Sequence, residues 1–416
     1  MAVRIGRRAL FAGAGVAAMS ARLRTTFADT SPLRLGLSLP LSGPAQIVGA
    51  EIKIGADVAV AQVNRGGGVN GRLIELAVID DRGDPNQAIA GLHDFVGKDI
   101  HLIIGGALTT TALATAPTLD SLNIIFQVLS SPALGLTHEL FNRRMFCDLE
   151  NNYTRMRSFA SFVTQRYPEV KTWIGAVSDN ASGNEAWSLF SYNLQQFHKG
   201  KANNVVTFSD ALKAKPGSTD FKDIISTIAA SPAEGLFTLL VGADGISFYQ
   251  QMRAFGLQTK IKVFAENALE SALPQALKKN MPENVWTFTQ WAYSAFKDLP
   301  EARELAAATE QKGEAYPYGL AAMGHTAVKA YAAALRATGG VSDTDKIIAA
   351  LESVKFDTVR GNNYFRREDH QNMASVNIVN FVPNDSPQGW GVREVVTLSD
   401  SDNINAPTPG VAFKLE

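Results

Sequence analysis

The sequence predicts an α/β fold made of two halves, each a parallel sheet with helices on both faces. Segments with the two-residue period of a strand alternate along the chain with segments of helical period, joined by short links. This alternation restarts near Thr172, after a first series that ends near Val128. The length of 416 residues agrees with this division, because single cores stop growing at roughly 250–300 residues.

Each element of the first half has its own signal. Leucines at alternate positions of residues 33–39 predict a strand that ends at Pro40. Apolar residues then step by three or four through residues 48–63, which predicts a helix that ends at three glycines. Asp84 and Pro85 predict another helix start, since aspartate caps and proline fits the first helical position. The remaining elements are strands at 73–79, 102–104 and 124–128 and a helix at about 110–122.

The second half repeats the alternation, and the end of the chain completes both halves. Its expected strands are 172–177, 204–208, 236–241 and 261–265, with helices near 184–198, from about 219 and at 244–255. Three helical segments between 300 and 353 and strands at 363–366, 375–382 and 392–397 follow. These late elements are too few for a third domain. No long proline- or serine-rich linker occurs, so we expect the chain to cross between the halves more than once.

Composition excludes several classes of protein. Hydrophobic residues make up 46% and charged residues 19%, which is typical of a folded, soluble chain rather than a disordered or membrane-embedded one. The 39 basic and 40 acidic side chains nearly balance, so no nucleic-acid partner is expected. The single cysteine, Cys147, rules out an internal disulfide or a cysteine metal cluster. The six histidines lie far apart and form no HExxH pair, so we expect no metal and no cofactor.

Residues 1–28 predict a signal peptide. An apolar run at 9–19 follows three arginines, and as a helix of about 16 Å it is too short to cross a hydrocarbon core of roughly 30 Å. The adjacent Arg7 and Arg8 and the basic residues after the run are typical of a twin-arginine signal, with cleavage after Ala28. Removal of this segment takes away five arginines and no acid, which changes the formal charge from −1 to −6. We therefore expect an exported, periplasmic protein.

Catalytic motifs are incomplete throughout. Residues 13–18 match a dinucleotide-binding pattern, but they lie in the predicted signal peptide. The run 91–99 differs from a phosphate-binding loop in glycine spacing and carries Asp99 where a hydroxyl is needed. Acids at 80, 81 and 84 lack the rest of a calcium-binding loop. No GxSxG motif occurs, so we expect no enzyme.

Polar residues at strand ends predict a small-ligand site. In doubly wound sheets, ligands bind beyond the carboxyl ends of the strands, next to helix N-termini. The strand 102–104 leads into Gly105 and Gly106 and then into threonines 109–111, just before a helix. Glycines allow close backbone approach, and hydroxyls with free N–H groups suit a carboxylate. The next strand ends in Ser130-Ser131. For each hydroxyl, helix capping is the alternative interpretation.

Seven short motifs occur in a fixed order along the chain. They are Leu39-Pro40-Leu41-Ser42-Gly43-Pro44, residues 64–71 (NRGGGVNG), residues 80–85 (DDRGDP), Ile104-Gly105-Gly106, residues 131–134 (SPAL), Thr219-Asp220-Phe221 and residues 356–361 (FDTVRG). Together they closely resemble the periplasmic leucine/isoleucine/valine-binding proteins of ABC importers. The resemblance extends from about Leu33 to Phe381.

This resemblance implies a type I periplasmic-binding-protein fold, in which two doubly wound lobes joined by three crossovers enclose a central ligand cleft. We place the crossovers near 147–151, 288–291 and 360–364. The predicted lobe 1 is then residues 29–147 plus 290–361, and lobe 2 is residues 148–289 plus 362–416.

The resemblance also implies which residues bind the ligand. Thr109 and Thr110 match hydroxyl residues that hold the ligand carboxylate, and Val128 and Ser130 match the adjoining strand end. Glu266 matches the acid that holds the ammonium, and a buried acid does need a cationic partner. Without the family match, Glu266 would be interpreted as a solvated loop charge.

Three wall positions that are often aromatic in relatives carry smaller residues here, namely Val48, Ser182 and Val241. Smaller side chains at these positions predict an enlarged pocket. Phe126, Phe288 and Trp291 either form a different wall or belong to the core.

We therefore expect a monomeric, non-enzymatic periplasmic receptor that closes two lobes around a hydrophobic or branched-chain amino acid. Its expected partner is an ABC permease in the inner membrane. One alternative keeps the fold but binds a larger carboxylate or amide, such as an aromatic acid. Another is a ligand sensor rather than a transport receptor.

Overall fold

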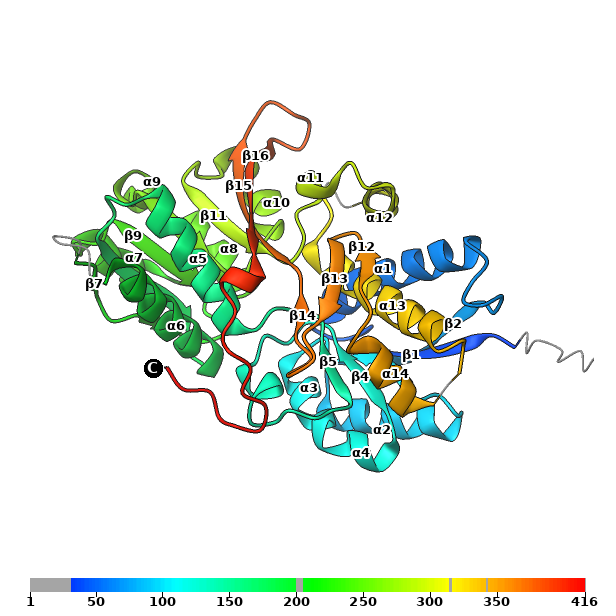
Figure 1. Cartoon of the computed structure of the whole chain (residues 1–416). Coiled ribbons are helices and arrows are strands. Elements are labelled where there is room, and N and C mark those ends of the chain that lie inside the picture. The colour runs from blue at the N-terminus through cyan, green and yellow to red at the C-terminus, as the bar shows by residue number, and fades with distance from the viewer. Residues whose placement is uncertain (1–30, 200–204, 314–315, 342, 416) are drawn as a thin grey trace, which may run out of the picture.

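The computed structural model describes residues 31–199, 205–313, 316–341 and 343–415 (Figure 1). The predicted signal peptide lies outside these residues. Two large sheets form two halves that lie side by side, and the chain passes between them more than once. Among the described residues, no helix is long and apolar enough to span a membrane.

The sheet of the first half is wholly parallel, with strand order β2-β1-β3-β4-β5. Its strands are β1 (Leu33–Leu39), β2 (Ile74–Asp80), β3 (Leu102–Gly105), β4 (Ile125–Val128) and β5 (Met145–Cys147). Because β1 pairs with both β2 and β3, the strand order reverses there. This arrangement places the β1 and β3 carboxyl ends beside each other at one edge.

Helices cover both faces of this sheet. One face carries α1 (Gln46–Arg65), α12 (Pro300–Glu310), α13 (Gly319–Ala337) and α14 (Thr344–Leu351). All four alternating leucines of β1 pack into this layer, as their period predicts. The other face carries α2 (Pro85–Gly97), α3 (Thr109–Thr115) and α4 (Leu119–Leu122). The Asp84 side chain accepts hydrogen bonds from the N–H groups of Asn86 and Gln87, which confirms the predicted helix start.

The second half has a mixed sheet of order β16-β15-β11-β10-β9-β6-β7, with β8 also beside β6. Strands β6 to β11 are parallel, and β15 and β16 run antiparallel at one edge. The strands are β6 (Thr172–Ser178), β7 (Thr207–Phe208), β8 (Leu212–Ala214), β9 (Gly235–Leu239), β10 (Val263–Glu266), β11 (Val285–Thr289), β15 (Ser375–Pro383) and β16 (Trp390–Ser399).

Two hydrophobic layers sandwich this second sheet. On one face lie α5 (Asn152–Arg166) and α6 (Ala181–His198). On the other lie α7 (Lys222–Ala230), α8 (Ala243–Gln251), α9 (Leu257–Lys260) and α10 (Ala272–Leu277). A short α11 (Tyr293–Phe296) follows β11. The two α/β halves predicted from the sequence are therefore confirmed.

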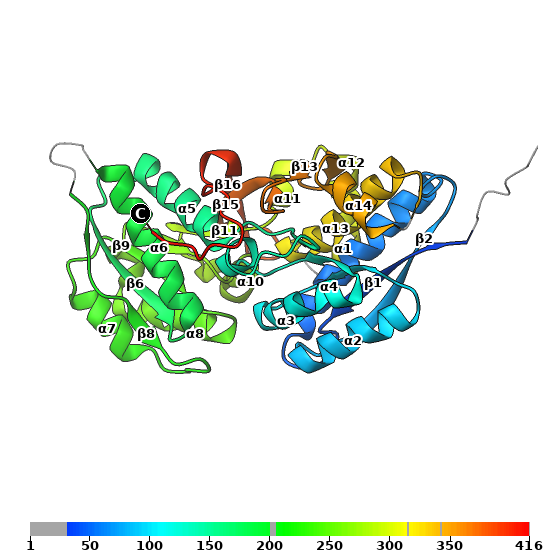
Figure 2. The same cartoon turned by 60° about the horizontal axis from the view of Figure 1, so that its bottom comes forward.

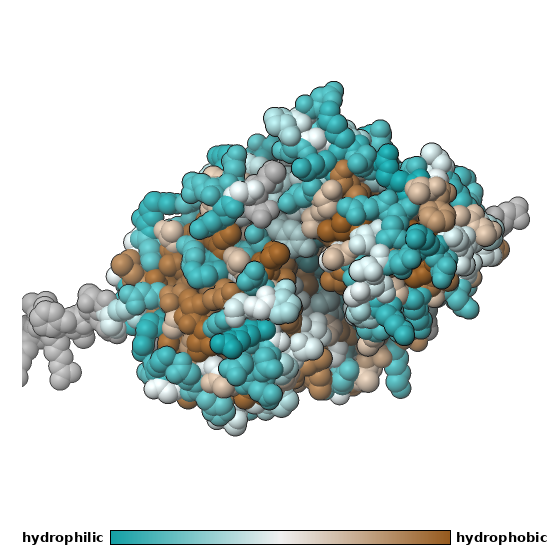
Figure 3. Space-filling view, turned by 180° about the vertical axis from the view of Figure 1, so that it is seen from behind, coloured by the Kyte–Doolittle hydropathy of each residue, from teal (hydrophilic) through white to brown (hydrophobic). Residues whose placement is uncertain are grey.

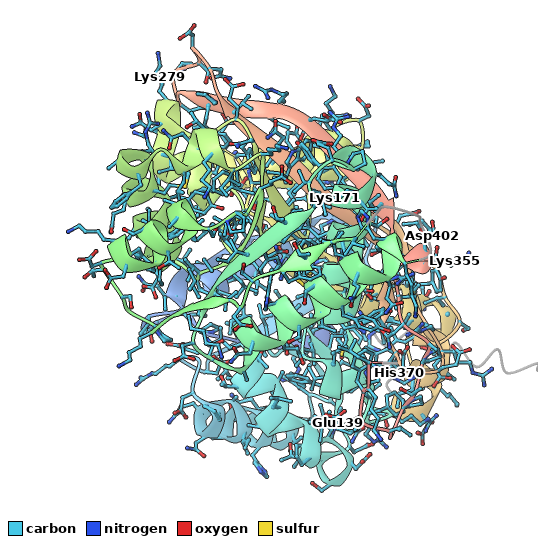
Figure 4. The ribbon with its side chains drawn as sticks, turned by 90° about the vertical axis from the view of Figure 1, so that its left-hand side faces the viewer. Glu139, Lys171, Lys279, Lys355, His370 and Asp402 are labelled. Carbon is cyan, nitrogen blue, oxygen red and sulfur yellow. The ribbon has the colours of Figure 1, made fainter. Side chains whose placement is uncertain are left out.

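A small third sheet lies where the chain returns from the first half to the second. It contains β12 (Phe356–Thr358), β13 (Gly361–Phe365) and β14 (Asn372–Met373). Next to β14, Gln371 pairs with Cys147. The neighbouring His370, labelled in Figure 4, places its Nδ1 atom 3.0 Å from the carbonyl oxygen of Met145. These contacts attach residues 361–373 to the first half. The lobe boundary at 361/362 remains a prediction, and the contacts favour a later crossing, just before β15.

Several elements were not predicted from the sequence, among them α5, β5, β8 and β11. Helix α5 buries Met156, Phe159, Ala160 and Val163 at helical spacing, but its first two turns also bury polar residues, including Asn152, Thr154, Arg155 and Ser158, which obscure this apolar pattern. All residues of β11 are buried, so the strand lacks the alternation that identifies a half-exposed strand.

Candidate ligand-binding site

The carboxyl ends of the parallel strands in both halves lead into loops beside the space between the halves. Figure 2 shows α3 of the first half opposite α8 and α10 of the second. In space-filling view, the surface is hollowed between the two halves (Figure 3). Doubly wound sheets bind ligands at such strand ends, so this is the candidate site.

Two hydroxyl loops of the first half meet here, as predicted. Thr109 is the first residue of α3, and its hydroxyl accepts a hydrogen bond of 3.2 Å from Ser131. Thr110 is exposed at the next position, and Ser130 is half-buried. Gly106 has φ of +63°, and a Cβ there would meet Val128, Ala112 and Phe126 at 3.1–3.3 Å. Only glycine therefore allows the β3–α3 turn to pack this closely.

The side chain of Val128 does not lie with these hydroxyl groups. Its side chain is fully buried in the hydrophobic layer beneath α2 and α3, and its carbonyl oxygen accepts a hydrogen bond from the N–H of Asp148. The side chain of Val128 therefore belongs to the core and does not face the space between the halves.

The acids of the DDRGDP motif fix the neighbouring loops. Asp80 Oδ1 accepts from the N–H of Leu41 at 2.8 Å, and Asp80 Oδ2 accepts from the Ser42 hydroxyl at 2.6 Å. The Ser42 hydrogen bond lowers the pKa of the Asp80 carboxyl. Asp81 accepts from the Ser38 hydroxyl at 2.9 Å. The acids therefore tie the β1–α1 loop to the β2–α2 loop.

The three predicted wall positions lie on three different elements. Val48 is half-buried in the first turn of α1. Ser182 is exposed at the start of α6, and Val241 is 60% exposed between β9 and α8. None of the three supplies a large buried side chain.

Glu266 is buried at the end of β10 and is not a solvated loop charge. Its Oε1 accepts from the N–H groups of Ala268 at 2.6 Å and Leu269 at 2.9 Å. Its Oε2 accepts from the Thr287 hydroxyl. Burial is the main cause that raises the pKa of the Glu266 carboxyl.

Two charged residues beside Glu266 were missed from the sequence. Arg155 of α5 is 9% exposed, donates from Nη2 to the carbonyl oxygen of Asn267 at 2.8 Å, and places its guanidinium 3.9 Å from the centre of the Phe288 ring. Glu270 Oε2 accepts from the Thr289 hydroxyl at 2.8 Å and from the N–H of Gly319 at 3.2 Å. Because Gly319 opens α13, Glu270 joins the second half to a helix of the first.

Burial raises the pKa of Glu270 to about 7, although its hydrogen bonds and Arg155 act in the opposite direction. Tyr318 lies within electrostatic range of Glu270, Glu266 and Arg155. No sequence motif identifies this cluster, because Arg155 lies among buried polar residues in the first turns of α5 and Glu270 lies in a turn after β10.

Comparison with known proteins shows which family and which fold the chain matches. A family model described as periplasmic binding protein matches residues 32–386. Leu/Ile/Val-binding protein homolog 3 of Brucella melitensis is 23% identical over 323 residues, which cover 70% of this chain and 84% of the relative.

Solved structures share the fold. The leucine-, isoleucine-, valine-, threonine- and alanine-binding protein of Brucella ovis in its closed conformation superposes with a TM-score of 0.80 at 18% identity, covering 92% of this chain and 99% of that one. An ABC transporter solute binding protein of R. palustris in complex with 4-hydroxybenzoate has a TM-score of 0.72 at 21% identity, covering 89% and 97%. The predicted type I fold is thus confirmed.

The family model spans the first sheet, the second sheet up to β15, the hydroxyl loops and the Glu266 region. Its members are binding proteins of exported, periplasmic location rather than enzymes. The chain belongs to the periplasmic binding protein family, as its seven motifs predicted.

Proposed function

We propose that this protein is the substrate-binding component of an ABC importer and that it binds a hydrophobic or branched-chain amino acid between its two halves. The observation that supports this most is the family match over residues 32–386, which includes both strand-end surfaces. The relatives named as Leu/Ile/Val-binding proteins favour this ligand class.

The two sides of the site suit the two ends of an amino acid. Thr109, Thr110 and Ser130 offer hydroxyl groups at the carboxyl edge of the first sheet, which suits a carboxylate. The second half offers buried acids, Glu266 and Glu270, which suit an ammonium. Closure of the halves around the ligand then presents a surface made of both to the permease.

Isothermal titration calorimetry with the twenty amino acids tests this proposal. We expect saturable binding of one or a few hydrophobic members. A protein that binds none of them, while folded and cooperative in thermal unfolding, would show that the proposed ligand class is wrong.

A second candidate is an aromatic or larger carboxylate in the same site. It is favoured by the small side chains of Val48, Ser182 and Val241 at the predicted wall positions. It is also favoured by the R. palustris solute binding protein, which shares the fold and was solved in complex with 4-hydroxybenzoate. A thermal-shift screen separates the two candidates, because a ligand at 100 times its Kd stabilises the folded state by about 2.7 kcal/mol.

We also propose export by the twin-arginine route with cleavage after Ala28, and a monomer in solution. Mass spectrometry of the periplasmic protein should give an N-terminus at Asp29, and Arg7→Lys with Arg8→Lys should block export. Isolation of the uncleaved protein from the cytoplasm would favour the sensor alternative instead.

A further inference from the structure

The hydrogen bonds of Glu266 leave it little capacity for a ligand. Two backbone N–H groups and one hydroxyl, all from the protein, already reach its two oxygens. The residue is 0% exposed. These hydrogen bonds close the turn after β10 and connect it to β11 through Thr287. Glu266 therefore stabilises the conformation of this turn.

Glu270 differs from Glu266 because only one of its two carboxylate oxygens accepts hydrogen bonds from the residues that the structure describes. Its Oε2 is held by Thr289 and by the N–H of Gly319, but within the described part of the chain no group donates to its Oε1. Because the held oxygen faces the first turn of α13, the carboxylate also lies where the helix dipole favours negative charge.

A second acceptor lies beside it. Gln290 is 5% exposed, and its Oε1 has no hydrogen-bond partner. A Cβ built on Gly319 would lie 2.6 Å from Glu270 Oε2 and 2.9 Å from Gln290 Oε1, so both side chains reach the same point above α13. A buried amide oxygen and a carboxylate oxygen without donors are costly unless a donor is supplied.

The charges around this point favour a cation as that donor. Arg155 is the base that acts on Glu270, and it also faces Glu266 and Glu150. Arg360 lies 3.6 Å from Glu150 and also acts on the buried Asp148, so it adds no free positive charge to the cluster. Glu266 and Glu270 therefore share one arginine, so when both carboxylates are ionised a ligand ammonium would supply the second cation of the cluster.

We propose that Glu270, with Gln290, is the acceptor set for the ligand ammonium, and that Glu266 is a positioning residue that holds the turn on which Glu270 sits. The inference rests on the proposed function and specifies it further: the ligand carries a primary ammonium group. Because Glu270 also contacts Gly319, the ammonium binds where the two halves meet, and its binding is coupled to their relative position.

The test compares Glu270→Gln, Glu266→Gln and the control Glu169→Gln, which removes an equal charge from an exposed loop. Calorimetry uses the amino acid that binds best to the wild type and the same acid without its amine, for example L-leucine and 4-methylpentanoate. We expect Glu270→Gln to weaken amino-acid binding by about tenfold or more and to leave binding of the deaminated acid unchanged. Gln290→Leu should act in the same direction.

A pH series gives a readout that a structural role would not move. Wild-type affinity for the amino acid should fall below about pH 7, where Glu270 becomes protonated, and Glu270→Gln should lose this dependence. If the wild type binds an amino acid and Glu270→Gln binds it equally well, the assignment of Glu270 is wrong but the proposed function stands. A wild type that binds no amino acid overturns the proposed function and the assignment with it.

Discussion

Gly55 of α1 lies directly against the backbone carbonyl of Ala321 in α13. A methyl group on Gly55 would fall 1.7 Å from that oxygen, and one on Gly324 would fall 2.0 Å from the carbonyl oxygen of Ile52. The two helices therefore touch backbone to backbone in the layer that covers β1. Because α13 also supplies Gly319, this contact fixes the position of the helix end that holds Glu270.

Gly55→Ala should lower the free energy of unfolding by about 3 kcal/mol, because the added methyl group meets backbone that cannot rotate away. Urea unfolding of the purified variant measures the loss. Gly97→Ala is the matched control, since Gly97 ends α2 and a Cβ there meets nothing within 4 Å. The control should be neutral or gain up to about 1 kcal/mol from helix propensity. Equal stability of the two variants would contradict the proposed close packing.

Much of this fold is predictable from local pattern. The alternating leucines of β1 and the Asp84-Pro85 helix start need only their own neighbours to be interpreted, and both were predicted correctly. Strand β11 and helix α5 were not predicted, because their local patterns are not clear. Strand β11 is buried on both faces and so lacks the alternation of a half-exposed strand, and α5 has buried polar residues such as Arg155 among its apolar ones, which obscure its helical period.

The candidate site likewise contains residues that can be predicted from the sequence and residues that cannot. Thr109 and Ser131 come together because they follow adjacent parallel strands, and strand order can be predicted. Arg155 and Glu270 meet only because α5 packs against the turn after β10. Such a cluster depends on tertiary packing, and sequence spacing does not reveal it.

Glu270→Gln should change how stability depends on pH. Burial raises the folded-state pKa of Glu270 from its usual 4.5 to about 7, so between these values the folded protein binds a proton that the unfolded chain lacks. Wild-type stability therefore contains a contribution that is lost as pH rises through this window, up to about 3 kcal/mol. Glutamine does not titrate. In the absence of ligand, urea unfolding should show that the stability of the variant increases relative to that of the wild type as pH rises from about 5 to about 8. Parallel pH curves would show that Glu270 titrates normally.

Cys147 should resist thiol reagents in the folded protein. It is 3% exposed at the end of β5, and burial raises the pKa of its thiol far above the usual range, with Asp148 and Asp369 adding to the shift. Only the thiolate reacts at an appreciable rate. Labelling with a chromogenic disulfide should be absent in native buffer and complete, with one thiol per chain, in denaturing urea. Rapid native labelling would show that the link after β5 opens readily.

Asn405 should stabilise the contact between the C-terminal segment and both halves. Its Nδ2 donates to His138 Nε2 at 2.8 Å, and its Oδ1 accepts from Asn151 Nδ2 at 3.0 Å. Its carbonyl oxygen accepts from Arg366 at 2.9 Å. His138 follows β4 in the first half, whereas Asn151 caps α5 in the second, so one side chain joins the two.

Asn405→Ala leaves the buried His138 and Asn151 groups without these partners and should cost about 1–3 kcal/mol in urea unfolding. Thr408→Ala, at an exposed position of the same segment, is the control and should change little. Hydrogen exchange gives a local readout, because the N–H of Gly410 donates to the carbonyl oxygen of His138 at 2.7 Å. Protection of Gly410 should fall in Asn405→Ala alone. If both variants behave alike, the segment is held by its backbone and by Phe413, whose ring lies 5.2 Å from that of His138.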